Sequence, residues 1–327
     1  MKRQLVLPRS GAALTALLLA APARAAVAAP DFVVENAVPG VGFNNPTAFA
    51  FTPDGRILVA EKRGVVRVVK DGVKLLQPMW SGEAEVLNNG DRGLLSIAVD
   101  PHYATNHFIY LAYSVDPDSN GADDNDDAFG RVTRYRTSEA DWNVVDPTSR
   151  TVLIGATWRE GFPSGSSFHA VGALRWGADG SLLVSWGEGA HYTEMDQGGI
   201  DPGLFGPGRT DPYEDIGAFR AQYIGSLGGK VLRINPDTGH GYASNPFQDG
   251  DLGSNRSRIW AYGFRNPFRF CVQPGTGSPD TAAADPGVVC VGDVGWNTWE
   301  ELDVAARGGL NFGWPCYEGN EIGRAHV

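Results

Sequence analysis

Short apolar runs separated by turn residues recur along most of this chain. Within the runs, β-branched, aliphatic and aromatic residues predominate, and Asp-Gly, Pro-Asp and Asn-Pro pairs stand between the runs. This pattern predicts β-strands joined by tight turns, and no long segment carries the 3.6-residue stripe of an amphipathic helix. The expected strands are Thr47–Phe51, Arg56–Glu61, Val65–Val69, Leu94–Val99, Phe108–Ser114, Arg131–Arg136, Ala173–Trp176, Leu182–Trp186, Lys230–Ile234, Arg258–Ala261 and Phe268–Val272.

One turn phrase occurs twice. An apolar residue is followed after two positions by Asp-Gly and then by an apolar run ending in Val, at Phe51–Val59 and again at Trp176–Val184. Repetition of a strand-turn-strand unit is what an array of similar sheets produces. The 43 Gly and 21 Pro residues follow no short period and fit many turns between short strands. The expected fold class is all-β, of the β-propeller type.

The chain is acidic. It carries 27 Lys and Arg against 38 Asp and Glu, a formal charge of −11, and four of the basic residues lie within residues 1–25. Without that segment the formal charge is near −15. A surface of this sign repels nucleic acid and anionic membranes. We therefore expect no nucleic-acid partner.

The N-terminus has the pattern of an export signal. A positive start is followed by the apolar stretch Ala12–Ala21 and by a small-x-small cleavage site at residues 23–25, with a second possible site at 26–28. The apolar stretch is too short to span a bilayer, and so is every later one. We expect residues 1–25 to be a signal peptide and the protein to be exported, to the periplasm or the outside. An uncleaved membrane anchor is the alternative.

The segment Ile259–Gly319 carries most of the candidate chemistry. It places Arg265 and Asn266 between aromatic residues and a proline, so that a guanidinium and an amide stand on a rigid turn. Further along, three Trp residues crowd around several carboxylates, a composition that suits a cation or a polyhydroxylated ligand. The alternative is a strand pair whose Trp residues pack the core and whose carboxylates face water.

The order of several segments carries a family resemblance. From near Asn45 to Gly319 the chain resembles the glucose/sorbosone dehydrogenase family through the segments NPTAFAFTPDGRILVAEKRGVVRVV, GDRGLLSIAVDP, FHAVGALRWGADGSLLVSWGEG, LGGKVLRINPDTG and SRIWAYGFRNP. The resemblance implies that residues 26–320 form a six-bladed β-propeller and that the protein is a soluble quinoprotein acting on sugars. Family members continue beyond this point, so the propeller is expected to be incomplete, with the last one or two blades missing. Residues 321–327 read as a translated sequencing adapter and are expected to be an artefact.

The resemblance implies a catalytic role for His169. In the family, a histidine at this place takes the proton of the anomeric hydroxyl while hydride passes to the cofactor, which requires a neutral imidazole. An acid after the next strand orients the imidazole, and this chain has Glu188 there, where most members carry Asp. A structural histidine and an ordinary strand-end acid are the alternatives. Arg92 and His191 fall on loops that line the family's cleft, and a surface loop is the default for His191.

The resemblance also implies the cofactor pyrroloquinoline quinone (PQQ). Arg265 and Asn266 match the pair that binds the quinone oxygens, where a guanidinium stabilises negative charge as it develops. Arg265 is therefore expected to act in catalysis as well as in cofactor binding. Trp314 matches an aromatic residue that covers the cofactor plane, and core packing is its alternative role.

The family's PQQ is bridged by a calcium ion, which would lie on the segment Asp293–Asn297 of this chain. The candidate ligands are Asp293, Gly295 and Asn297. The chain reads Asp-Val-Gly-Trp-Asn there, whereas the best-characterised sugar oxidisers of the family carry Gly-Pro.

A second calcium candidate is the acidic loop that begins at Asp116. Asp116, Asp118, Asn120 and Asp127 follow the spacing of a calcium-binding loop. However, a strand-like segment precedes the loop, and Pro117 does not favour a flanking helix. A solvated acidic loop is the alternative.

The three cysteines suggest one disulfide bridge. Cys271 and Cys290 flank a Pro- and Gly-rich loop of an expected hairpin, and an oxidising compartment would allow them to pair. This pairing leaves Cys316 without a partner.

The sequence contains no haem-attachment motif, no dinucleotide-binding glycine fingerprint and no serine nucleophile elbow. These absences argue against a nicotinamide enzyme and against a serine hydrolase. The resemblance implies instead an exported quinoprotein that oxidises an aldose at C1 to the lactone, with PQQ and Ca²⁺, and passes electrons to an external acceptor. The alternative is a non-catalytic propeller that binds glycan or protein ligands, because hedgehog-interacting propellers resemble the same DVGxxxxEE element. Only the enzyme needs His169 and Arg265 together.

Overall fold

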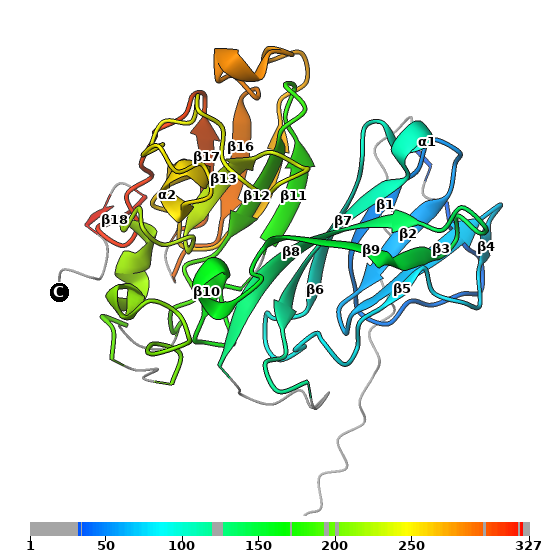
Figure 1. Ribbon diagram of the computed structural model, residues 1–327, viewed down its shortest axis with the longest axis horizontal. Helices are drawn as coiled ribbons and strands as arrows, with labels where there is room; N and C mark the ends of the chain where they lie inside the picture. The colour runs from blue at the N-terminus through cyan, green and yellow to red at the C-terminus, as the bar shows by residue number, and fades with distance from the viewer. Residues whose placement is uncertain are drawn as a thin grey trace, which may run out of the picture.

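The computed structural model describes residues 32–33, 35–119, 127–170, 172–192, 196–199, 203–296, 299–319 and 321–322. These residues form four antiparallel β-sheets and a small hairpin, joined by loops and short helical turns (Figure 1). The all-β prediction is confirmed. Within these residues, no helix has the length and apolar character needed to cross a membrane.

Each sheet, called a blade here, is built mainly from strands that are consecutive in the chain. Blade 1 contains β1 (Pro46–Phe51), β2 (Ile57–Glu61), β3 (Val65–Lys70), β4 (Val73–Lys74) and β5 (Trp80–Ser81). Blade 2 contains β6 (Leu94–Val99), β7 (Phe108–Val115), β8 (Ala128–Thr137), β9 (Val145–Ile154) and β10 (Phe162–Ser164). Blade 3 contains β11 (Gly172–Trp176), β12 (Leu182–Trp186), β13 (Lys230–Ile234) and β14 (Ile259–Tyr262). Blade 4 contains β15 (Pro267–Val272), β16 (Val289–Asp293) and β17 (Glu301–Ala305).

The remaining elements are short. The strands β18 (Tyr317–Glu318) and β19 (Glu321–Ile322) form the hairpin. The helical turns are α1 (Tyr103–Asn106), α2 (Asn255–Arg258) and the 3₁₀ turns η1 (Trp158–Glu160), η2 (Pro212–Glu214), η3 (Gly217–Ala221) and η4 (Thr281–Ala283).

The first strands of the four blades lie next to one another at a common hub. Strand β1 packs against β6, β6 against β11, and β11 against β15. The Nη2 atom of Arg269, on β15, donates to the carbonyl oxygen of Thr47, on β1, at 3.0 Å. Blade 4 therefore reaches back to blade 1, as in a β-propeller. The described residues contain four blades, whereas the resemblance implies six for the complete ring.

Apolar layers between neighbouring blades form the core. One cluster joins blades 1 and 2, a second joins blades 2 and 3, and a third joins blades 3 and 4. Trp186 on β12 is fully buried and stacks on Phe162 with the ring centroids 4.6 Å apart. A Cβ atom at Gly130, on β8, would lie 2.3 Å from the Trp186 ring, so only glycine leaves room for the indole.

Blades 1 and 4 each present apolar side chains to solvent. Phe49 and Phe51 of β1 are 65% and 63% exposed, and Leu302 of β17 is 75% exposed. A sheet face of this composition is normally covered by a neighbouring layer.

The expected bridge between Cys271 and Cys290 is not formed. The two residues are directly opposite each other on β15 and β16, yet both are free thiols, as is Cys316. Burial and the neighbouring Cys271 raise the pKa of the Cys290 thiol. A raised pKa disfavours the thiolate that disulfide formation requires.

The two copies of the Asp-Gly turn connect the first and second strands of blades 1 and 3. In blade 1, Asp54 Oδ2 pairs with Arg56 Nη2 at 2.6 Å. In blade 3, Asp179 Oδ2 accepts from both Nε (2.8 Å) and Nη2 (2.6 Å) of Arg233, and both side chains are fully buried. The second pair therefore has no access to water, and each charge depends on the other.

We predict that Asp179→Asn lowers the free energy of unfolding by about 3 kcal/mol, because it leaves the buried Arg233 guanidinium without its counter-charge. The matched control is Asp237→Asn, which removes a carboxylate that is 71% exposed and lies 2.6 Å from Arg134. The control should cost less than about 1 kcal/mol. Chemical denaturation measures both values, and equal losses would contradict the assignment of Asp179.

Candidate active site

Most of the site residues predicted from the sequence gather at one end of blades 3 and 4. His169 precedes β11 and Glu188 follows β12, while Arg265 and Asn266 belong to the turn between β14 and β15. Asp293 is the last residue of β16. Because consecutive strands in these sheets run antiparallel, these positions lie at the same end of the two blades.

His169 and Glu188 form a buried hydrogen-bonded pair. His169 Nδ1 lies 2.8 Å from Glu188 Oε1, and the two residues are 4% and 1% exposed. A carboxylate bound to Nδ1 places the proton of the neutral imidazole on Nδ1 and leaves the lone pair on Nε2. The backbone of His169 has φ +55°, uncommon for a residue other than glycine, and its N–H donates to Asp91 Oδ2 at 3.1 Å. The pair therefore presents a proton acceptor in a fixed position.

Asp293 fixes the turn that carries Arg265 and Asn266. Its two carboxylate oxygens accept the backbone N–H groups of Arg265 at 2.9 Å and of Asn266 at 2.6 Å. The Arg265 carbonyl oxygen accepts the Glu188 N–H at 3.0 Å. Burial raises the pKa of Asp293 well above its usual range, although both N–H donors act in the opposite direction. The turn is thus tied to the backbone of the histidine–carboxylate pair.

Gly187 allows the two halves of the site to meet. A Cβ atom at this position would lie 2.1 Å from the His169 carbonyl oxygen and 2.8 Å from Asn266 Oδ1. A larger residue would force these groups apart. The structure therefore brings His169, Glu188, Arg265 and Asn266 together, and their catalytic and cofactor roles remain predictions.

Trp314 covers the guanidinium of Arg265. The Arg265 Cζ atom lies 5.4 Å from the centroid of the indole ring, and Trp314 is only 3% exposed. The Trp314 carbonyl oxygen accepts Gln222 Nε2 at 2.6 Å, which anchors this segment to the loop before β13. The contact between guanidinium and indole is a cation–π interaction. Trp314 therefore belongs to the site rather than to a separate core.

Four unpaired buried polar atoms lie at this site. Among the described residues, Glu188 Oε2, Arg265 Nε, Asn266 Oδ1 and Trp314 Nε1 are buried and lack a hydrogen-bond partner. Each such atom costs about 1–3 kcal/mol when it stays unpaired. Four of them around one turn indicate a ligand that both donates and accepts hydrogen bonds. The N–H donors fit the quinone and carboxylate oxygens of PQQ, and the two acceptors fit the hydroxyl groups of a sugar.

The described donors do not fit the expected calcium ion. Both carboxylate oxygens of Asp293 are engaged by backbone N–H groups, and the Gly295 carbonyl oxygen accepts Arg265 Nη1 at 2.8 Å. A cation cannot share that carbonyl oxygen with a guanidinium at this distance, because the like charges repel and the space is filled. The third candidate, Asn297, lies outside the described residues. The predicted metal site on Asp293 and Gly295 is therefore not supported.

The described residues of the acidic loop after β7 do not form a calcium-binding site either. Asp116 Oδ1 accepts the Ser119 N–H at 3.1 Å, and Asp127 pairs with Arg209 at 3.0 Å. Asn120 lies outside the described residues. Within the part of the chain that the structure describes, no group of three or more His, Cys, Asp or Glu side chains is placed to hold a metal ion.

Two buried cations support the backbone of Glu188, and sequence reasoning missed both. Arg220 Nε donates to the Glu188 carbonyl oxygen at 2.8 Å, and its Nη2 donates to that of Gly189 at 3.0 Å. Lys230 Nζ donates in turn to the Arg220 carbonyl oxygen at 2.8 Å. Burial lowers the pKa of Lys230 to about 7. A lysine at the start of a fully buried strand, Lys230 of β13, is the signal in the sequence that could have indicated this cluster.

The other two residues noted in the sequence lie at the margins of the site. Arg92 is fully buried and binds the segment before His169, because its Nε donates to Ser164 Oγ at 3.1 Å. The His191 backbone N–H donates to Asp196 Oδ2 at 3.2 Å, and the residue is half-buried. Arg92 is thus a structural support for the segment that precedes His169.

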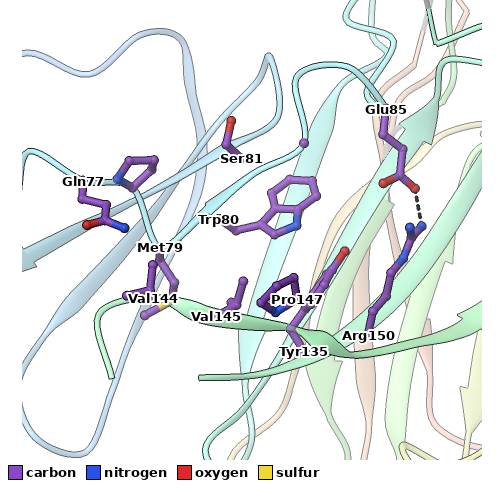
Figure 2. Close-up of a pocket in the computed structure, with 12 residues that line it drawn as sticks. Gln77, Met79, Trp80, Ser81, Glu85, Tyr135, Val144, Val145, Pro147 and Arg150 are labelled. Carbon is purple, nitrogen blue, oxygen red and sulfur yellow. Dashed lines mark hydrogen bonds and ion pairs between the residues drawn. The ribbon is translucent and has the colours of Figure 1, made fainter. Parts of the chain in front are cut away.

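A separate pocket of about 490 Å³ lies between blades 1 and 2 (Figure 2). Trp80 and Tyr135 line it, together with Met79, which precedes β5, and with Val145 and Pro147 of β9. At its edge Glu85 is ion-paired with Arg150, as Figure 2 shows, and accepts from Tyr113 Oη at 2.8 Å. This pocket contains none of the site residues predicted from the sequence.

The fold and the site define a β-propeller with a histidine–carboxylate pair at the ends of its blades. The chain belongs to the Glucose / Sorbosone dehydrogenase family, whose pattern it matches over residues 43–326. Aldose sugar dehydrogenase YliI of Escherichia coli is 25% identical over 273 residues, which cover 83% of this chain and 59% of that protein. The chain therefore spans less than two thirds of that relative.

Two further similarities bear on function. The PQQ-bound form of an aldose sugar dehydrogenase from Streptomyces coelicolor aligns with a TM-score of 0.60 and 25% identity, covering 90% of this chain and 69% of that one. The hedgehog-interacting protein of Mus musculus is 27% identical over 156 residues, which cover 45% of this chain and 21% of that protein. The relatives thus include enzymes and a protein named for binding another protein.

Glu214 is a buried carboxyl group beside Arg220 and Lys230, the two cations that support the backbone of Glu188. Its carbonyl oxygen accepts Arg220 Nη1 at 3.1 Å, and its Oε2 atom has no partner among the described residues. Burial raises the pKa of this carboxyl from 4.5 to about 7. The folded protein therefore retains a proton on Glu214 over a pH range in which the unfolded chain has lost it.

We predict that the stability of the wild-type protein falls, relative to that of Glu214→Gln, as the pH rises from 4.5 to about 7. The sign follows because a raised carboxyl pKa favours the folded state only while the group stays protonated. Unfolding midpoints measured across this range for both proteins provide the test, with the exposed Glu139→Gln as control. Parallel pH curves for wild type and Glu214→Gln would show that Glu214 ionises normally.

Proposed function

We propose that this chain is an exported quinoprotein dehydrogenase that oxidises an aldose at C1 to the lactone. The observation that carries the proposal is that the His169–Glu188 pair and the Arg265–Asn266 turn meet at one polar site. Membership of the sugar dehydrogenase family supports a sugar substrate. The signal-like pattern of residues 1–25 supports export to the periplasm or the outside.

The histidine supplies the base. In this proposal His169 Nε2 accepts the proton of the C1 hydroxyl group, while the C1 hydrogen leaves as hydride with its electron pair, and the lactone carbonyl forms. Glu188, bound to Nδ1, keeps the imidazole oriented and stabilises its protonated form. The longer side chain of Glu188, compared with Asp, still reaches the imidazole at hydrogen-bond distance.

The second half of the site holds the cofactor. When bound, PQQ supplies a quinone that takes up the hydride, and an external electron acceptor then reoxidises it. Arg265 and Asn266 would hold its oxygen atoms, and Trp314 would cover its ring. The Arg265 guanidinium would offset negative charge that develops on the quinone oxygens.

A second candidate function is ligand binding without catalysis. The pocket between blades 1 and 2, with Trp80, Tyr135 and the Glu85–Arg150 ion pair, combines apolar and charged groups that suit a glycan or a protein segment (Figure 2). The similarity to a hedgehog-interacting protein also favours this function. Reduction of a redox dye by aldoses in the presence of PQQ separates the two candidates, because only the enzyme produces it.

We predict that His169→Asn lowers kcat by about 10²- to 10⁴-fold, because the proton acceptor is lost. Asn tolerates the positive φ of this position, so the fold should persist. PQQ affinity, followed by quenching of tryptophan fluorescence, should change less than about threefold. Dye reduction with aldoses measures kcat.

The control is His240→Asn, which alters an exposed histidine of blade 3 and should leave kcat unchanged. Activity of His169→Asn within about threefold of wild type would show that His169 is not the base. A folded wild-type protein that reduces no dye with any aldose would favour the ligand-binding function.

A further inference from the structure

The turn after β16 directs two consecutive carbonyl oxygens at one cation. Arg265 Nη1 donates to the carbonyl oxygen of Val294 at 3.0 Å and to that of Gly295 at 2.8 Å. The N–H groups of the same turn point to carboxylates, because Gly295 N–H donates to Glu300 Oε2 at 3.2 Å. The carbonyl pair is thus fixed in place by acceptors on one side and by the guanidinium on the other.

The guanidinium is as firmly held as the carbonyl pair. The backbone N–H of Arg265 is bound by Asp293, its carbonyl oxygen accepts the Glu188 N–H, and its Cζ atom lies 5.4 Å from the ring of Trp314. Arg265 is 4% exposed, and its Nε atom is buried without a partner in the described residues. The Nη1 atom of the guanidinium therefore donates to the carbonyl pair, and the Nε atom remains to bind a ligand.

A divalent ion and this guanidinium cannot occupy the carbonyl pair together. Calcium binds carbonyl oxygens at about 2.3–2.6 Å, which is shorter than the contacts that Arg265 already makes with the same two atoms. The strongest ligand that the turn could add, the carboxylate of Asp293, has both oxygens bound to N–H groups. Calcium would have to displace Arg265 and would gain no free carboxylate from Asp293.

We propose that Arg265 is the built-in cation of this site, so that the chain binds an anionic quinone cofactor without a divalent metal ion. The proposal rests on the proposed function for the identity of the cofactor. It differs from the resemblance, which implies a calcium ion bridging PQQ to this turn. The positive charge that calcium would supply comes instead from the guanidinium, which spans the carbonyl pair and the ligand.

The first experiment measures PQQ binding to the full chain by tryptophan fluorescence, once with EDTA and once with excess calcium. The dissociation constant should change less than about threefold between the two conditions. Calcium that tightens PQQ binding about tenfold or more would overturn the proposal. If PQQ binds in neither condition, the proposed function fails, and the second experiment still decides the role of Arg265.

The second experiment uses the metal alone. Tb³⁺, a luminescent substitute for Ca²⁺, is added to the full chain without PQQ. Its emission is excited through tryptophan, because Trp314 lies against Arg265, whose guanidinium binds the carbonyl pair. Wild type should give no saturable signal beyond that of the control Arg175→Gln, which removes an exposed arginine of β11. Arg265→Met should gain a saturable signal at Tb³⁺ concentrations about tenfold or more below those at which the other two proteins give any signal.

Equal Tb³⁺ binding by wild type and Arg265→Met would overturn the proposal. Circular dichroism shows whether Arg265→Met folds. If it does not, Arg265→Lys retains the charge on a shorter side chain and should still exclude Tb³⁺, whereas Tb³⁺ binding by wild type and by Arg265→Lys alike would contradict the inference.

Discussion

The carboxylate of Asp293 is the constraint on which the candidate site depends. It is buried, and it accepts the backbone N–H groups of Arg265 and Asn266, two consecutive residues of one turn. These two hydrogen bonds fix the turn that carries the Arg265 guanidinium and the Asn266 amide. The Arg265 carbonyl oxygen then positions Glu188 by accepting its N–H. A change at Asp293 would therefore move both halves of the site, although Asp293 itself touches neither proposed substrate nor base.

Buried cations bound to backbone carbonyl oxygens recur around this site. Arg265 spans Val294 and Gly295, Arg220 holds Glu188 and Gly189, and Lys230 holds the carbonyl of Arg220. Buried charges are costly unless their hydrogen-bonding groups are satisfied, so each of these cations orders the loop that surrounds it. These hydrogen bonds hold the loops at the blade ends in place, which favours a site prepared in advance for its ligand.

The strands follow from the sequence where side-chain alternation and turn residues agree. Leu182–Trp186 and Lys230–Ile234 were predicted with their observed bounds, because each is a short run rich in aliphatic residues between Gly-containing turns. Strand β9 (Val145–Ile154) was missed, since Asp, Pro and Ser interrupt its pattern at the edge of blade 2. Strand β16 was missed because its short run ends in Gly-Asp, which reads as a turn.

The site was predictable only in part. The resemblance placed His169 with Arg265, and no spacing rule could have done so, because the two residues are distant in the chain. The sequence predicts Asp293 as a metal ligand, whereas the structure shows its carboxylate accepting two backbone N–H groups. A sequence shows a carboxylate but not the donors that face it. Arg220 carries no motif at all, and its role depends on where η3 (Gly217–Ala221) lies relative to Glu188.

The most direct test of the account is a crystal structure of the full chain with PQQ bound. The account predicts that the quinone contacts Arg265 and Asn266 beneath Trp314, with His169 Nε2 facing the space left for a sugar. PQQ bound elsewhere, for example in the pocket beside Trp80 and Glu85, or a His169 Nε2 atom enclosed by protein with no access to the cofactor, would contradict it.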